Sequence, residues 1–283
     1  MGASALEQAR DFELTEREFN QIRKLVIEHT GISLSDAKRN LVYSRLSKRL
    51  RQMQLGDFRS YIKLLESPEG SDELANFTNA ITTNLTSFFR EDHHFEYLKG
   101  TVIPQLMREN ADTKKIRIWS AGCSTGEEPY SIAMAVREII PETSDWDIRI
   151  LATDLDTNVL AHASAGIYTL ERLNNVSKSR MKRWFLRGKG ENSGSVKVSS
   201  VLQSMITFKQ LNLMNDWPIK NQFDLLFCRN VVIYFDKPTQ RTLFSRYYHH
   251  IKDSGHMFLG HSETLYKVSD QFELIGQTIY KKK

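Results

Sequence analysis

The stretch KIRIWSAGCSTGEEPYSIA, residues 115–133, places a short apolar run, a loop of small residues and the start of a helix in immediate succession. The run 115–119 has the branched and aromatic side chains of a buried strand, and apolar residues recur at helical spacing after Glu128. Gly122 and Gly126 let the connecting backbone turn tightly and come close to a ligand. This unit predicts a doubly wound α/β sheet with a ligand site in the loop.

The alternation of strand and helix patterns continues through the second part of the chain. The expected strands are 115–119, 148–153, 223–228, 255–260 and 272–280, and the expected helices are 128–140, 157–165 and 238–251. Strands separated by helices of this length pair in parallel, with crossovers on both faces of the sheet. We therefore predict a Rossmann-like α/β domain over residues 101–283.

Residues 167–212 interrupt this alternation. The segment RGKGENSGSVKV, 187–198, is rich in glycine and polar turn residues. Val196 and Val198, and later Ile206 and Phe208, recur at strand spacing. We expect a small antiparallel β insert over 167–212.

The first part of the chain has helical patterns only. After a tail at 1–11, Thr15 and Glu18 form a capping-box signature and Gly31 suits a helix end. Further helices are expected at 36–54, 57–65 and 71–82. These patterns predict an all-α N-terminal domain over residues 12–100.

Composition narrows the class of protein. The 283 residues and 40% hydrophobic content suit two domains with real cores. No apolar stretch is long enough for a membrane span and the start lacks a secretory core, so we expect a cytoplasmic monomer without membrane insertion. Cys123 and Cys228 are too few for a disulfide framework and lack metal-ligand spacing. We expect reduced thiols and no metal.

The net charge of +5 is located in residues 36–66, which hold eight basic and three acidic residues. On the helix expected at 36–54, apolar residues occupy one face and basic residues a neighbouring one. That basic face suits either solvent or an acidic partner, and on charge alone both remain open. Its residues are Lys38, Arg45, Lys48 and Arg49.

The loop after the first strand discriminates between ligands. Its G-x-x-x-G spacing matches neither phosphate-binding glycine motif, and it has no lysine. Glu127 and Glu128 would repel a pyrophosphate but suit an ammonium or sulfonium group, and Asp154 ends the next strand where a ribose diol would be held. The combination favours S-adenosylmethionine. Taken singly, the glutamates could be helix-dipole complements and Asp154 a turn former.

Two further stretches are expected at the same edge of the sheet. NLTSFFRED, 84–92, joins the two halves, and CRNVVIYFD, 228–236, leaves the third strand. Asn230 at a strand end can hold a cofactor or substrate amide, and Tyr234 is close to it in sequence. Arg90 could equally pair with a neighbouring glutamate, and Tyr234 could be a half-buried aromatic residue.

The motifs TTNLTSFFRE, WSAGCSTGEEPYSIA, ATDLDTNVL, FCRNVVIYFD and GHSE together resemble the chemotaxis receptor methyltransferases, the CheR-type protein-glutamate O-methyltransferases. The resemblance extends over nearly the whole chain. It implies methyl transfer from S-adenosylmethionine to receptor glutamates, giving methyl esters and S-adenosylhomocysteine. Arg90 and Tyr234 would lie closest to the transferred methyl, and Glu127 is the less certain member of its pair. The implied cofactor residues are Asn84, Thr86, Arg90, Glu128, Asp154, Asn212, Leu213, Asn230 and Val231.

The resemblance also suggests partners. The basic helix would lie along the receptor's acidic cytoplasmic helical bundle, and in some members an insert of this kind accepts the receptor's C-terminal peptide as an added strand. A glutamate is already ionised at neutral pH, so no catalytic histidine is expected.

Two other functions remain open at this point. A nucleic-acid methyltransferase would also join this fold to a basic domain, although the charge is confined to one helical element without interleaved aromatics. A non-catalytic receptor-binding module could have kept the fold.

Overall fold

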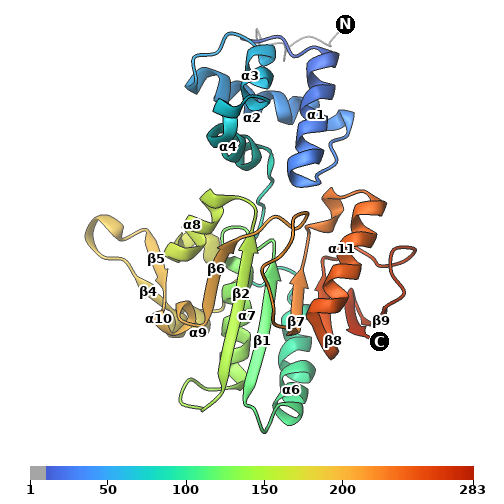
Figure 1. The fold of residues 1–283 in the computed structure, drawn as a ribbon. Coiled ribbons are helices and arrows are strands. Elements are labelled where there is room, and N and C mark those ends of the chain that lie inside the picture. Colours follow the sequence, from blue (N-terminus) through green and yellow to red (C-terminus); the bar gives the residue numbers. More distant parts are fainter. Residues whose placement is uncertain (1–10) are drawn as a thin grey trace, which may run out of the picture. The chain divides into compact units, whose positions relative to one another are not determined.

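The computed structural model describes residues 11–283, and the chain forms two compact units that divide between Thr83 and Asn84 (Figure 1). The division expected at residue 100 therefore moves toward the N-terminus. Phe88, Phe89 and Phe95 are buried in the core of the second unit, so the segment that carries them belongs to that unit. The interruption of helical pattern after Ile81, rather than the first strand, marks the boundary.

The first unit is helical throughout its described residues, as predicted. Thr15 caps α1 through the expected capping box, and Gly31 ends that helix with a left-handed backbone. Asp57 accepts a hydrogen bond from the Ser60 amide and caps α3. The helices are α1 (Glu16–Thr30), α2 (Arg39–Gln52), α3 (Phe58–Leu65) and α4 (Ser71–Ile81), with a short 3-10 turn, Asp36–Lys38, before α2.

Two members of the expected basic face of α2 are engaged within the unit. Arg45 donates to the carbonyls of Ile81 and Thr82, both at 2.7 Å, and so caps the C-terminus of α4. Arg49 pairs with both carboxylate oxygens of Glu73, which is only 5% exposed. Lys38 and Lys48 are exposed.

A seven-stranded sheet forms the centre of the second unit, in the order β6-β2-β1-β7-β8-β10-β9. The five strands from β6 to β8 pair in parallel with their neighbours. β10 pairs antiparallel with both β8 and β9. The strand predicted at 272–280 is thus a hairpin of two strands. The strands are β1 (Lys115–Ala121), β2 (Asp147–Asp154), β6 (Ile206–Gln210), β7 (Phe223–Cys228), β8 (Ile251–Leu259), β9 (Phe272–Gly276) and β10 (Ile279–Lys282).

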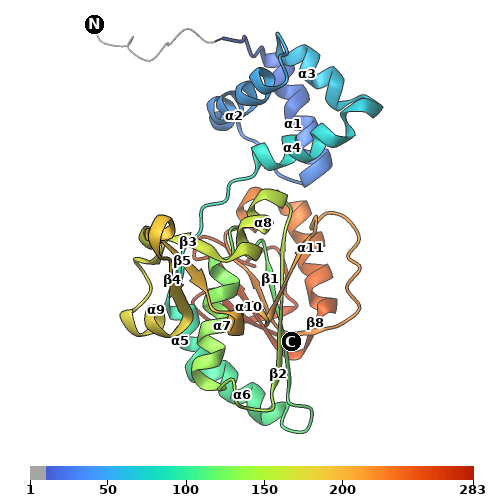
Figure 2. The same cartoon turned by 90° about the vertical axis from the view of Figure 1, so that its left-hand side faces the viewer.

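The crossover helices agree with the predicted ones to within one residue at each end. They are α7 (Glu127–Ile139), α8 (Thr157–Ala165) and α11 (Lys237–His250). Figure 2 shows α7 on one side of the sheet and α11 on the other, which confirms the doubly wound arrangement. Shorter helical segments precede β1: α5 (His93–Tyr97), a π-helical turn (Leu98–Val102) and α6 (Ile103–Glu109). Within residues 11–283, no helix is both long and apolar enough to cross a membrane.

The antiparallel insert is smaller than predicted. Its three strands pair in the order β3-β5-β4, with β3 (Ile167–Thr169), β4 (Phe185–Arg187) and β5 (Ser195–Val198). Between them lie the 3-10 turn η4 (Leu170–Leu173) and the helix α9 (Lys178–Trp184). The strand at Ile206 belongs to the main sheet instead, because it pairs in parallel with β2 from Ile150 to Asp154. Strand spacing alone could not distinguish these two sheets.

Candidate active site

The edge formed by the carboxyl ends of β6, β2, β1 and β7 gathers the predicted cofactor residues. These four strands are consecutive in the sheet and parallel, so the residues that follow them meet at one edge. Leu211, after β6, donates its amide to the Asp154 carbonyl at 2.9 Å, which places Asn212 and Leu213 beside the end of β2. Asn230 and Val231 follow β7 in the same way.

The loop after β1 is held in one conformation by neighbours on both sides. The amides of Gly122 and Cys123 both donate to the Thr153 carbonyl, at 2.8 and 2.9 Å. Gly122 has φ +87°, and a Cβ placed there would lie 2.3 Å from a methyl group of Val231. The glycine is therefore required by both the backbone angle and the contact.

Asp154 is buried at the end of β2 and fixes this loop. Its carboxylate accepts hydrogen bonds from the amides of Ser124, at 2.8 Å, and Asp156, at 3.0 Å. Burial raises the pKa of Asp154, against the effect of these hydrogen bonds. A carboxylate has about four lone-pair sites, so acceptor capacity remains for a ribose hydroxyl.

The segment after Thr83 is tied to the same loop. The Asn84 amide donates to Asp156 Oδ2 at 2.7 Å, and Ser124 Oγ donates to the Asn84 carbonyl at 2.9 Å. Thr86 follows two residues later and is partly exposed. This segment therefore reaches the same edge as the loop and Asp154.

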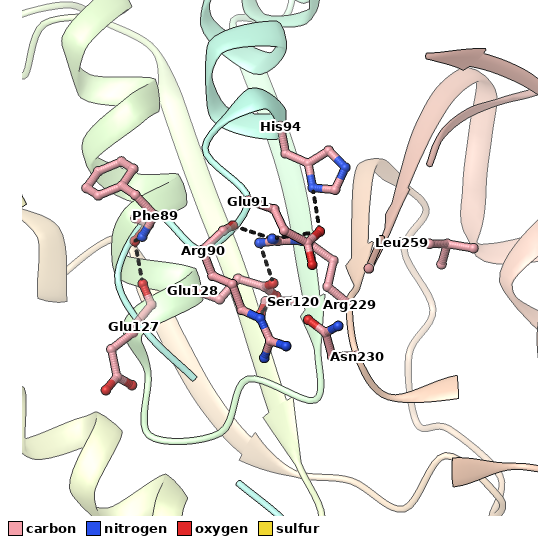
Figure 3. A network of polar contacts seen from close by, with 12 residues as sticks. Phe89, Arg90, Glu91, His94, Ser120, Glu127, Glu128, Arg229, Asn230 and Leu259 are labelled. Atoms are coloured by element: carbon pink, nitrogen blue, oxygen red, sulfur yellow. Dashed lines mark hydrogen bonds and ion pairs between the residues drawn. The ribbon is translucent and has the colours of Figure 1, made fainter. Parts of the chain in front are cut away.

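A chain of charged side chains passes beneath the edge, with Arg229 at its centre (Figure 3). Its guanidinium lies 3.2 Å from Glu91 and 3.2 Å from Glu128, and it also donates to the Arg90 carbonyl. Ser120 Oγ donates to the other oxygen of Glu128 at 2.8 Å. Arg229 is 6% exposed, so the two glutamates neutralise a cation that burial would otherwise disfavour.

The ionisable residues around Arg229 have pKa values shifted in different directions. Complete burial raises the pKa of Glu128, although Arg229 and Ser120 oppose the shift. Burial acts in the same direction on Glu91, but the hydrogen bond from His261 and the charge of Arg229 outweigh it and lower the pKa of Glu91 to about 2. Burial, with the nearby Arg229 charge, lowers the pKa of His94 to about 4. His94 is thus neutral at pH 7.

Glu263 fixes the turn after β7. Its carboxylate accepts hydrogen bonds from the amides of Asn230 at 2.8 Å, Gly260 at 2.6 Å and Ile233 at 3.2 Å. Asn230 has φ +60°, an uncommon conformation for a residue with a side chain. The buried carboxylate therefore maintains a backbone conformation that presents Asn230 at the edge.

Further residues of the same segments have uncommon backbone angles. Phe89, Glu91 and Ser124 also have positive φ, at 51°, 58° and 49°. Such residues cost about 1 kcal/mol or more each and persist where surrounding contacts maintain them. The strained positions flank Arg90 and occupy the loop after β1, which is typical of a functional site.

The two residues expected nearest the transferred methyl lie on these segments. Arg90 donates from Nη1 to the Leu85 carbonyl at 2.9 Å and is partly exposed. Tyr234 ends the 3-10 turn Val232–Tyr234 after Asn230 and is half-buried. Glu127 points elsewhere, because its carboxylate is bound by Thr125 and Arg172.

Comparison with known proteins identifies the family. A model described as "CheR methyltransferase, SAM binding domain" matches residues 84–281, and "CheR methyltransferase, all-alpha domain" matches residues 17–82. The chain belongs to the CheR methyltransferase family. S-adenosylmethionine is therefore the cofactor of the second unit, and the two matched ranges meet where the compact units divide.

Named relatives cover nearly the full length. Chemotaxis protein methyltransferase 2 of Pseudomonas aeruginosa is 45% identical over 96% of this chain and 95% of its own. The chemotaxis protein methyltransferase of Escherichia coli is 41% identical over 97% and 94%. The Borreliella burgdorferi protein of the same name is 39% identical over 95% of each chain.

The site fits this cofactor. Asp154 has acceptor capacity for a ribose hydroxyl, the left-handed backbone at Gly122 holds the loop against the end of β2, and Glu128 lies beneath the same edge. The sequence-based assignment did not include the residues that support these groups: Arg229, Glu263, Glu91 and His261. Arg229 and Glu263 lie within the motifs FCRNVVIYFD and GHSE, but their contacts join segments distant in sequence, which spacing could not reveal.

Proposed function

We propose that this protein transfers a methyl group from S-adenosylmethionine to glutamate side chains of chemotaxis receptors, producing glutamate methyl esters and S-adenosylhomocysteine. The observation that carries the proposal is the gathering of Asp154, Glu128, Asn230 and the Arg90 segment at one edge of a fold whose full-length relatives are named chemotaxis protein methyltransferases. Two units with the same boundary as the two family models support the same reading.

The site suits a substrate that needs no deprotonation. A glutamate carboxylate has a reference pKa of about 4.3 and is already a nucleophile at pH 7. His94, the buried histidine beside Glu91, is neutral and holds the Gln277 carbonyl rather than facing a substrate as a base. S-adenosylmethionine, when bound, supplies an electrophilic methyl group on a sulfonium. The protein must therefore align the glutamate carboxylate with this methyl group and exclude water from the site.

Individual residues then have separate roles. We assign the diol to Asp154 and the ammonium group to the side of the edge near the acidic side chain of Glu128. Arg90 orients cofactor and substrate. A guanidinium that bound the substrate carboxylate too tightly would stabilise the ground state more than the transition state, so Tyr234 provides a weaker hydroxyl contact.

The Tyr234 assignment is testable alone. Tyr234→Phe removes one hydroxyl from a half-buried ring and should lower kcat about 10-fold while changing the affinity for S-adenosylhomocysteine little, because the contact forms in the transition state. Initial-rate kinetics at saturating receptor measure this. Unchanged turnover would exclude the hydroxyl from the mechanism.

The first unit provides a receptor surface in this proposal. Lys38 and Lys48 are exposed and positively charged, which suits an acidic helical bundle. Arg45 and Arg49 use some of their N–H donors within the unit, so only their other N–H groups can contribute to this surface. The exposed edge of β4 in the insert offers unpaired backbone groups to a receptor C-terminal peptide. In this proposal the protein acts as a cytoplasmic monomer and binds both the helical bundle and the C-terminal peptide of the receptor.

Mass spectrometry of a receptor cytoplasmic fragment incubated with the protein and S-adenosylmethionine tests the reaction. Methyl groups should appear on glutamates and disappear after mild alkali, because esters hydrolyse. Asp154→Asn replaces one carboxylate acceptor with a donor, at the cost of a loop hydrogen bond and of the contact with the diol, and should give little product. An alkali-stable methyl group on nucleic acid, or cofactor binding without any methylated receptor, would contradict the proposal and favour a nucleic-acid methyltransferase or a receptor-binding module.

A further inference from the structure

The antiparallel insert contacts the loop after β1 through two side chains. Tyr168 of β3 is 2% exposed and donates its hydroxyl to the Thr125 carbonyl at 2.7 Å. Arg172 of η4 donates from Nε to Glu127 Oε1 at 3.0 Å and also through Nη2. Tyr168 and Arg172 thus hydrogen-bond to the loop from the insert, and neither residue has been assigned to cofactor or receptor binding.

Glu127 depends on this contact. The residue is fully buried, and among residues 11–283 its carboxylate pairs with one cation, Arg172. Its second oxygen accepts from Thr125 Oγ1 at 2.6 Å, so the same carboxylate also fixes the loop residue before Gly126. A buried carboxylate that loses its cation is strongly unfavourable and must move toward water. Such a movement would displace Thr125.

The insert also packs against the segment that carries Arg90. Phe88 lies edge-to-face on Tyr168, with ring centroids 5.0 Å apart, and on Phe185 of β4 at 5.6 Å. The guanidinium of Arg180, in α9, lies 3.8 Å from the centroid of Phe89, the residue with positive φ next to Arg90. Both segments of the site therefore rest on the insert.

We infer that Arg172 is a positioning residue for the cofactor loop, and that β3 and η4 of the insert form part of the framework of the methyl-transfer site. Arg172 acts through Glu127 and Thr125 on the loop that approaches the cofactor. Tyr168 acts on the same loop through the Thr125 carbonyl. The inference rests on the proposed function only in taking this loop as the cofactor loop.

Isothermal titration calorimetry with S-adenosylhomocysteine tests the inference on the full chain. Arg172→Met should weaken binding about 10-fold, because Glu127 loses its cation and the loop loses its fixed position. Steady-state kinetics should show KM for S-adenosylmethionine raised by a similar factor, with kcat at saturation changed by less than about twofold. A residue that only stabilised the fold would lower Tm without this division between KM and kcat.

Lys182→Met is the matched control, because Lys182 is an exposed cationic residue of α9 in the same insert. It should leave the affinity unchanged. Adding Glu127→Gln to Arg172→Met should restore part of the lost affinity, since no charge remains buried without a partner. Equal affinity of Arg172→Met and the parent protein, or no recovery in the double variant, would overturn the inference.

If Arg172→Met does not fold, Tyr168→Phe provides the same test through a volume-conserving change and should weaken binding about fivefold. Unchanged binding in Tyr168→Phe would then overturn the inference. A parent protein that binds S-adenosylhomocysteine but methylates no receptor would remove the proposed substrate and leave the role of Arg172 intact.

Discussion

Arg229 connects three parts of the site through one side chain. It contacts Glu91, Glu128 and the Arg90 carbonyl, so its loss would leave the buried carboxylate of Glu128 and the partly buried one of Glu91 without their shared cation. Arg229→Met should lower the free energy of unfolding by about 3–5 kcal/mol, since breaking a buried ion pair leaves uncompensated charge. Urea denaturation measures this change.

Arg241→Met, at an exposed arginine of α11, should change stability little and serves as the control. Arg229→Lys tests geometry, because an ammonium cannot reach two carboxylates and a carbonyl as a planar guanidinium does. If Arg229→Met unfolds at the same urea concentration as the parent protein, the ion chain contributes no stability.

His94 makes stability depend on pH. Its folded pKa of about 4 lies below the ordinary value of 6.5, so between these values the unfolded chain binds more protons. The free energy of unfolding should therefore fall as the pH decreases from about 6.5 to 4, by on the order of 3 kcal/mol for this residue. Denaturation at several pH values should show a shallower slope in His94→Gln and an unchanged slope in His249→Gln, at an exposed histidine.

Among the structural elements, the loop after β1 is held by neighbours on several sides. Gly122→Ala places a methyl group 2.3 Å from Val231 at a φ of +87°, so it should cost at least about 2 kcal/mol and weaken binding of S-adenosylhomocysteine. Gly190→Ala is the control, because Gly190 also has positive φ but faces open space. Thermal melts and calorimetry compare the two. Similar effects in both variants would mean that backbone angle alone, without the Val231 contact, explains the result.

The elements themselves could largely be predicted, because their signals are local. The capping box at Thr15 and the apolar runs of the parallel strands depend on residues close in sequence. The strand at Ile206 was assigned to the wrong sheet because pairing partners are not encoded by spacing. For the same reason the engagement of Arg49 with Glu73 and the role of Glu263 could not be predicted.

At the level of the whole molecule, each unit has its own hydrophobic core, and the basic residues of the first unit proposed to bind receptor lie in a different unit from the cofactor residues. Lys38→Glu with Lys48→Glu should raise KM for receptor about 10-fold or more and leave cofactor affinity unchanged, because it reverses exposed charge only. Receptor titrations and calorimetry with S-adenosylhomocysteine separate the two effects. Weakened cofactor binding would contradict this division.

Arg49 is unsuitable for the same test. Arg49→Glu would place a second carboxylate against buried Glu73, which also accepts a hydrogen bond from Tyr61 at 2.7 Å. Loss of receptor methylation in that variant would reflect a destabilised first unit. The exposed lysines avoid this ambiguity.

The strand order at the antiparallel end of the sheet has a consequence for the order of folding events. Within residues 11–283, β9 pairs with β10 alone, and β10 in turn lies against β8. β9 therefore cannot join the sheet before β10 is available to it. An intermediate in which β10 has not yet paired exposes the edge of β8, which makes this edge a place where partly folded chains can associate.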